Sequence, residues 1–189
     1  MVLEQVAIHE LHAELLALGV CHPGSLEPFG DRTRDREEVS ALRCSRSGVV
    51  VLSSVEHIDA AYYPDKEHGE LAALGDRDRV AMAHDEDTNR RASQFGASIT
   101  NKHWLDVGCG SGAMLDKLGQ RALTASAVEP QGEFQAALRV LGAQVHANIR
   151  DVPDTSVDIV TLFHVFEHLR TPLDDLTEIR RCSPPAARS

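Results

Sequence analysis

The stretch WLDVGCGSG, Trp104–Gly112, decides the fold that we predict for this chain. Its first half, Trp104 to Val107, is an apolar run typical of a short buried strand. A glycine-rich loop, Gly108 to Gly112, follows at once, and Ala113 to Leu118 has the composition of a helix. Glycine is favoured between a strand and a helix because the chain turns sharply there and because a ligand can approach the backbone closely. The stretch therefore predicts a strand, a ligand-binding loop and a helix.

The same alternation continues downstream of this loop. We predict strands at residues 123–128, 143–147 and 157–163, and helices at residues 134–141 and 173–181. The last of these strands is almost wholly apolar, as strands covered on both faces are. A further helix, at residues 85–99, leads into the first strand. Alternating strands and helices predict an α/β fold with a Rossmann-like, mostly parallel sheet and crossover helices.

Acidic residues beside the glycine loop restrict its ligand. Glu129 ends the second predicted strand, where a carboxylate can accept hydrogen bonds from both ribose hydroxyls of a nucleoside. Gly108, Gly110 and Ala113 match the dinucleotide pattern G-x-G-x-x-A, so a nicotinamide cofactor is one interpretation. Asp106, however, stands just before the loop. A carboxylate there would repel a pyrophosphate and would attract the cationic amino group of a methionine moiety.

These residues resemble the first motif of the class I S-adenosylmethionine-dependent methyltransferases, an acidic residue followed by G-x-G-x-G. Asp106, Gly108, Gly110 and Gly112 match that motif position by position. Glu129 takes the place of the acid that binds the ribose in that family. The resemblance implies S-adenosylmethionine as the cofactor and methyl transfer as the reaction. A nicotinamide-dependent enzyme and a non-catalytic nucleoside-binding module of the same fold are the alternatives.

A second segment extends the resemblance, which covers roughly residues 85 to 181. VDIVTLFHVFEHL, Val157–Leu169, is similar to the fourth strand of the family and to the turn after it, where many small-molecule methyltransferases read hVLEHl. His164 would then lie at the carboxyl end of a central strand, and it is our candidate catalytic base and pocket residue. Asn148 follows the third strand, in the loop that passes the adenine in this family. The predicted cofactor-binding residues are Asp106, Gly108, Cys109, Gly110, Gly112, Glu129, Asn148 and His164.

Two patterns raise the question of a metal. His164, Glu167 and His168 spell H-x-x-E-H, the inverted zinc-protease motif, which needs one long helix and a third ligand downstream. Here an apolar strand-like run leads straight into the first histidine. The segment around Cys44 resembles the leading region of some bacterial methyltransferases that carry a C-x-x-C-G zinc element, but Ser47 replaces the second cysteine. We therefore predict no metal.

Composition restricts the partners of the chain. The 189 residues are 42% hydrophobic and 25% charged, with a formal net charge of −10. This charge argues against nucleic acid as the main partner, because binding phosphates normally needs a basic face. We find neither a signal peptide nor an apolar run long enough for a bilayer, so we expect no membrane association and a cytoplasmic protein. We expect a small-molecule methyl acceptor.

The predicted domain organisation is an N-terminal extension, residues 1–84, and a methyltransferase-like domain, residues 85–189. The extension is expected to be helical and loop-rich, with a helix up to Leu18, a loop at 21–40, a short strand at 48–53 and a helical turn at 55–63. The family's sheet has the strand order 3-2-1-4-5-7-6, and this sequence provides the first four strands. We therefore expect a sheet that is incomplete at its C-terminus, and turnover that is in doubt.

Overall fold

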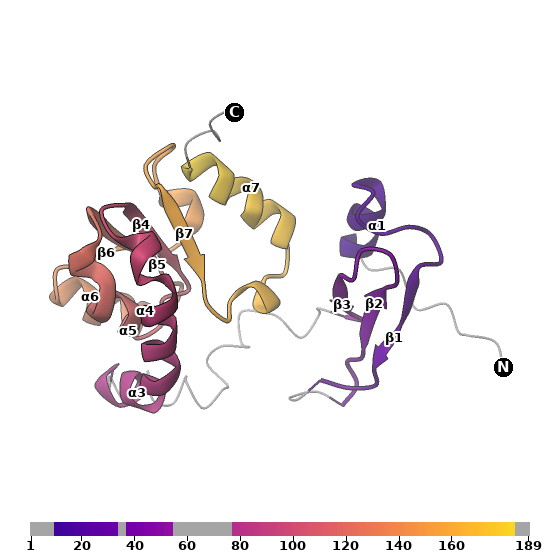
Figure 1. The fold of residues 1–189 in the computed structure, drawn as a ribbon, viewed down its shortest axis with the longest axis horizontal. Coiled ribbons are helices and arrows are strands. Elements are labelled where there is room, and N and C mark those ends of the chain that lie inside the picture. The colour runs from indigo at the N-terminus through magenta and orange to yellow at the C-terminus, as the bar shows by residue number, and fades with distance from the viewer. Residues whose placement is uncertain (1–9, 34–36, 55–76, 184–189) are drawn as a thin grey trace. The chain divides into compact units, whose positions relative to one another are not determined.

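A computed structural model describes residues 10–33, 37–54 and 77–183. The chain divides into two compact units, Met1–Asp59 and Ala60–Ser189, and each is considered by itself (Figure 1). The boundary predicted after residue 84 lies within the second unit, between two helices, and stays a prediction. The helical turn predicted at 55–63 lies outside the described residues.

In its described residues, the first unit is a small antiparallel sheet with one helix. The sheet has the order β1-β2-β3, and its core joins Leu15, Cys21, Cys44 and Val51. The elements are α1 (Glu10–Ala17), β1 (Leu26–Gly30), β2 (Ala41–Cys44) and β3 (Val50–Leu52).

The loop predicted at residues 21–40 is wrong in part, because β1 lies inside it. Pro28 and Gly30 indicate a loop, since both residues are unfavourable within a central strand. In the structure β1 is an edge strand, and its register against β2 shifts between Pro28 and Gly30. An edge position with a bulge tolerates both residues. The first unit thus contains a three-stranded antiparallel sheet beside its helix and loops, where the sequence predicted a single short strand.

The second unit contains the parallel sheet that the alternation predicted. The strand order is β6-β5-β4-β7, and every neighbouring pair is parallel. In order along the chain this is 3-2-1-4, the order implied by the resemblance for the first four strands. The strands are β4 (His103–Val107), β5 (Thr124–Val128), β6 (Gln144–His146) and β7 (Ile159–Leu162). The predicted α/β, Rossmann-like fold is confirmed.

Helices cover both faces of this sheet (Figure 1). The helices α4 and α5 have the bounds that the sequence predicted. The helices are α3 (Arg77–Ala83), α4 (Asp85–Ile99), α5 (Ala113–Leu118), α6 (Gly132–Val140) and α7 (Pro172–Cys182), with short 3-10 turns η1 (Gly119–Arg121), η2 (Ile149–Asp151) and η3 (Phe166–His168). In the part of the chain that the structure describes, no helix combines the length and the apolar character that crossing a membrane requires.

The central strand β4 divides its side chains between two cores. Trp104 packs with residues of α4 and α5 on one face. Leu105 and Val107 pack with α7 and η2 on the other face. Because side chains alternate along a strand, Asp106 lies on the same face as Trp104. The chain moves outward from β4 through β5 to β6 and then returns to β7 on the other side, so a topological switch point lies between β4 and β7. Open α/β sheets bind ligands at the carboxyl ends of the strands at such a point.

Candidate functional site

The glycine loop joins the carboxyl end of β4 to α5, and its three glycines all have left-handed backbone angles. The φ angles of Gly108, Gly110 and Gly112 are 69°, 53° and 77°. A Cβ at Gly108 would lie 2.4 Å from Cγ2 of Val165, and one at Gly112 would lie 2.4 Å from Cδ2 of Leu138. A Cβ at Gly110 would meet no atom of the described residues within 4 Å. The outer two glycines are therefore required by packing, whereas Gly110 leaves its surroundings open for a ligand.

Glu129 holds this loop from the end of β5. Its side chain is buried, and its two carboxylate oxygens accept hydrogen bonds from the backbone N–H groups of Gly110 and Gln131, both at 2.8 Å. Burial raises the pKa of Glu129, and these two N–H donors oppose that rise. Each carboxylate oxygen can accept a second hydrogen bond, so two adjacent ribose hydroxyls remain suitable partners. This geometry fits a nucleoside bound against Gly110.

Asp106 is buried beneath the loop and belongs to a hydrogen-bonded chain. The Thr161 hydroxyl donates to Oδ1 of Asp106 at 2.6 Å, and the Trp104 indole N–H donates to the Thr161 oxygen at 2.9 Å. Burial raises the pKa of Asp106 to about 7, although the Thr161 hydrogen bond and the charge of Arg91 oppose the rise. Thr161 is absent from the residues predicted for the site. The parallel register of β4 and β7, which pairs Asp106 with Thr161, is the signal that identifies it.

Cys109 contributes its backbone to the loop more than its thiol. Its side chain packs against the core cluster formed by Ala127, Leu138 and Val145. Burial raises the pKa of the Cys109 thiol well above its ordinary value, and the nearby carboxylates of Glu129 and Asp106 raise it further. A thiol that stays protonated is a poor nucleophile, so this environment does not favour the Cys109 thiol as a nucleophile.

Asn148 lies beyond the carboxyl end of β6 and caps the turn η2. Its Oδ1 accepts a hydrogen bond from the backbone N–H of Arg150 at 3.0 Å, and its own N–H donates to the Asp151 carboxylate at 3.1 Å. The residue is exposed. Its side-chain oxygen is engaged in the cap, and its role towards an adenine stays a prediction.

His164 follows β7 by two residues and has a positive φ of 55°, which is uncommon for a residue with a side chain. Its side chain is 70% exposed. Nδ1 lies 3.3 Å from Oε1 of Glu167, and Nε2 lies 3.7 Å from Oδ2 of Asp87 in α4. The next residue, Val165, contacts Gly108, so the segment after β7 lies against the glycine loop.

The metal interpretations find no geometric support in the described residues. Glu167 and His168 lie in η3, a single 3-10 turn, and not on the long helix that the inverted zinc-protease motif requires. Among the residues that the structure describes, no group of three or more histidine, cysteine, aspartate or glutamate side chains could hold a metal ion.

Two arginines near the site were not predicted as functional residues. Arg91 pairs with Asp87, and its guanidinium lies 5.1 Å from the centre of the Phe163 ring. Arg77 pairs with Asp116, which lies one helical turn into α5. Its buried Nε has no hydrogen-bond partner among the described residues. The sequence around Arg77 is charged and lacks an apolar period, so nothing in the pattern singles it out.

Comparison with known proteins supports what this geometry indicates. Residues 78–188, more than half of the chain, match the model of a family described as a methyltransferase domain. The chain belongs to the class I S-adenosylmethionine-dependent methyltransferases. Membership decides between the two cofactor interpretations in favour of S-adenosylmethionine, and the residues around Gly110 and Glu129 fit that cofactor.

Two individual proteins are similar to parts of this methyltransferase. A tRNA U34 carboxymethyltransferase of Shewanella frigidimarina is 33% identical over an alignment of 101 residues, and the match covers 48% of this chain. That stretch is 31% of the relative, so the chain spans about a third of its length. A solved S-adenosylmethionine-dependent methyltransferase from Aquifex aeolicus is 24% identical, with a TM-score of 0.48, over 64% of this chain and 69% of the other.

Proposed function

We propose that this methyltransferase binds S-adenosylmethionine at the carboxyl ends of β4, β5 and β7 and transfers the methyl group to a small-molecule acceptor. The observation that carries the donor site is the pairing of Gly110 with Glu129. Gly110 offers an approach that no Cβ obstructs, and Glu129 presents two fixed carboxylate oxygens beside it.

Each residue of the site has a distinct task in this proposal. Glu129 accepts hydrogen bonds from the ribose hydroxyls, and the backbone of Gly108 to Gly112 supports the rest of the nucleoside. Asp106 lies close beneath the loop, where its carboxylate would attract the cationic amino group of the donor. When bound, S-adenosylmethionine supplies an electrophilic methyl group on a sulfonium. The protein contributes mainly by positioning the reactants, which in favourable cases lowers a barrier by roughly 7–11 kcal/mol.

The charge around His164 favours a small acceptor. Asp87 and Glu167 face the two ring nitrogens of this exposed histidine, and the whole chain carries a net charge of −10. Such a surface would repel the phosphate backbone of a nucleic acid. It would not repel a small neutral or cationic acceptor. His164 is our candidate for accepting a proton from this acceptor, with Asp87 and Glu167 holding its ring.

A labelling experiment tests the donor and the acceptor together. The protein is incubated with methyl-labelled S-adenosylmethionine and either a low-molecular-weight metabolite extract or total tRNA, and the labelled products and S-adenosylhomocysteine are quantified. We expect label in small molecules and none in tRNA. Glu129→Ala should weaken donor binding by about 1.5–3 kcal/mol, measured by calorimetry, because charge-assisted hydrogen bonds are lost. Glu133→Ala, at an exposed position in α6, is the matched control.

A second acceptor class has one observation in its favour. The Shewanella frigidimarina relative is named for its action on tRNA U34. Label in tRNA alone would therefore support an RNA acceptor and contradict our small-molecule proposal. Tighter binding of NAD than of S-adenosylmethionine would contradict the donor site itself.

A further inference from the structure

The first unit contains two cysteines that the methyltransferase site does not use. Cys21 and Cys44 are 2% and 0% exposed and share one hydrophobic cluster, although 22 residues separate them in the sequence. Both are free thiols, and they are two of the four buried side chains of this cluster. The fold therefore brings the two thiols together in one small core.

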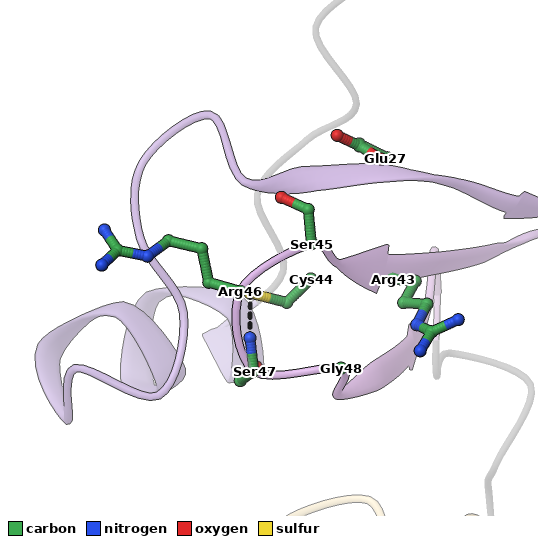
Figure 2. Close-up of a pocket in the computed structure, with 7 residues that line it drawn as sticks. All are labelled: Glu27, Arg43, Cys44, Ser45, Arg46, Ser47 and Gly48. Carbon is green, nitrogen blue, oxygen red and sulfur yellow. Dashed lines mark hydrogen bonds between the residues drawn. The ribbon is translucent and has the colours of Figure 1, made fainter.

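The turn after β2 folds around the sulfur of Cys44. The backbone N–H of Ser47 donates to this sulfur at 3.5 Å. The hydroxyl of Ser25 lies 3.2 Å from the same atom. Figure 2 shows the sulfur held inside the turn, with the Ser47 hydrogen bond drawn. A backbone N–H that donates to a sulfur favours the thiolate over the thiol.

The surroundings of the two thiols shift their pKa values in opposite directions. Hydrogen bonds lower the pKa of Cys44 to about 5, with the one between Ser25 and Cys44 as the largest cause. Burial and the hydrogen bond with Cys44 raise the pKa of Cys21. A thiolate and a thiol within one cluster are the two partners that disulfide formation requires, since the thiolate is the nucleophile. A surface hollow of about 510 Å³, lined in part by Cys44, Ser45 and Ser47, brings small solutes to this turn (Figure 2).

We propose that Cys21 and Cys44 form a reversible intrachain disulfide when the protein meets a small peroxide. The Cys44 thiolate attacks one oxygen of hydrogen peroxide, the O–O bond breaks, and a sulfenic acid and hydroxide form. The Cys21 thiol then attacks the sulfenic sulfur, the S–O bond breaks, and water leaves with the proton of the thiol. Two sulfur atoms lose two electrons in total, and the peroxide gains them.

Thiol mapping on the full chain tests this inference. The reduced protein is exposed to hydrogen peroxide, denatured, alkylated and digested, and its peptides are identified by mass spectrometry. We expect two of the four cysteines to lose their free thiol, as one peptide pair joined through Cys21 and Cys44, and dithiothreitol to restore both. Cys109 and Cys182, which belong to the other unit, serve as internal references and should stay alkylated.

Variants distinguish the effect of hydrogen bonds to Cys44 from the effect of the two cysteines being close together. Cys21→Ser should leave Cys44 as a sulfenic acid that dimedone labels, since the resolving thiol is missing. Ser25→Ala should slow disulfide formation, because the Ser25 hydroxyl lies 3.2 Å from the Cys44 sulfur. Ser45→Ala is the matched control, because its hydroxyl donates to the Ser25 carbonyl at 3.1 Å and not to a sulfur. Retention of all four thiols in the wild type, or a link through any other cysteine pair, would overturn the proposal. Neither result would affect the proposed methyl transfer.

Discussion

Substitutions in the glycine loop distinguish effects on the stability of the fold from effects on the binding of S-adenosylmethionine. Gly110→Ala should cost about 1–2 kcal/mol of unfolding free energy, because alanine is strained at a φ of 53° while its Cβ meets no described atom within 4 Å. Its Cβ would instead occupy space that we assign to the donor, so we expect at least a tenfold loss of affinity for S-adenosylmethionine, or about 1.4 kcal/mol. Urea unfolding and calorimetric titration measure the two effects.

Gly142→Ala is the control for this variant. Gly142 has a φ of 83°, its Cβ would also lie in open space, and it follows α6 away from the loop. It should show a similar loss of stability with unchanged affinity. Gly108→Ala should instead lose much more stability, because its Cβ would collide with Val165. Equal affinities of the Gly110→Ala and Gly142→Ala variants for S-adenosylmethionine would show that Gly110 is not part of the donor site.

The buried carboxyl group of Asp106 makes the free energy of unfolding depend on pH. Its pKa rises from an ordinary value of 3.8 to about 7 in the folded protein, so between these values the folded state holds a proton that the unfolded chain has released. Its contribution to stability is complete below pH 4, falls as the pH rises towards 7, and stays lost above 7. Asp106→Asn cannot ionise and should be more stable than the wild type at pH 8, by up to about 4 kcal/mol.

Unfolding in urea at pH 4.5 and pH 8 checks this expectation. At the lower pH the Asp106→Asn variant and the wild type should differ far less than at the higher pH. Asp158→Asn is the control, because Asp158 is an exposed acid that accepts a hydrogen bond from the His103 backbone at the amino end of β4. A stability difference for Asp106→Asn that is the same at both pH values would show that this carboxyl is not protonated in the folded state.

Residue spacing predicted where Asp106 and Glu129 lie in the fold, but not their contacts. Asp106 lies in β4, one residue before its end, and Glu129 directly follows β5, as the strand–loop–helix period predicts. That Glu129 binds the N–H of Gly110 depends on the exact turn, which φ angles decide and the sequence does not display. Predicting Thr161 as a residue of the site requires the pairing register of β4 and β7, two strands more than 50 residues apart in the sequence.

At the scale of elements, α6 supports the loop through one side chain. Leu138 is 2% exposed, packs with Ala127 and Val145, and contacts the α carbon region of Gly112. Leu138→Ala should lower the unfolding free energy by about 2–5 kcal/mol through the cavity that it leaves. Val140→Ala, in the same helix but 87% exposed, should change it by less than about 0.5 kcal/mol. Chemical denaturation compares them, and similar losses in both variants would mean that α6 is not anchored by Leu138.

Elements with a clear period were predictable, and elements defined by tertiary contacts were not. The helices α4 and α5 coincide with the residue ranges that the sequence indicated, because apolar positions and a flanking glycine or turn define them locally. The strand β1 had no such signature. Its burial pattern shows no fully buried residue, and Pro28 within it favours a loop on local grounds. Only its pairing with β2, which lies beyond a loop, makes it a strand.

At the scale of the whole molecule, the proposed donor site belongs to one unit. The glycine loop, Glu129 and His164 all lie within Ala60–Ser189. Leu15→Ala, which removes a buried side chain from the core of the other unit, should destabilise that unit and leave the affinity for S-adenosylmethionine within about twofold, or 0.4 kcal/mol. Limited proteolysis reports the first effect and calorimetry the second. A tenfold change in affinity would show that the first unit contributes to donor binding.

The hydrogen-bonded chain from Trp104 through Thr161 to Asp106 has an optical consequence. Trp104 is the single tryptophan of the sequence and is fully buried, so all indole fluorescence of the folded protein comes from one fixed environment. Its N–H is linked through one hydroxyl to a carboxyl that ionises near neutral pH. The emission should therefore depend on the protonation of Asp106. A cationic donor that causes Asp106 to release this proton should change the wavelength and the intensity of the emission. The protein thus carries its own reporter of cofactor binding, with no label attached.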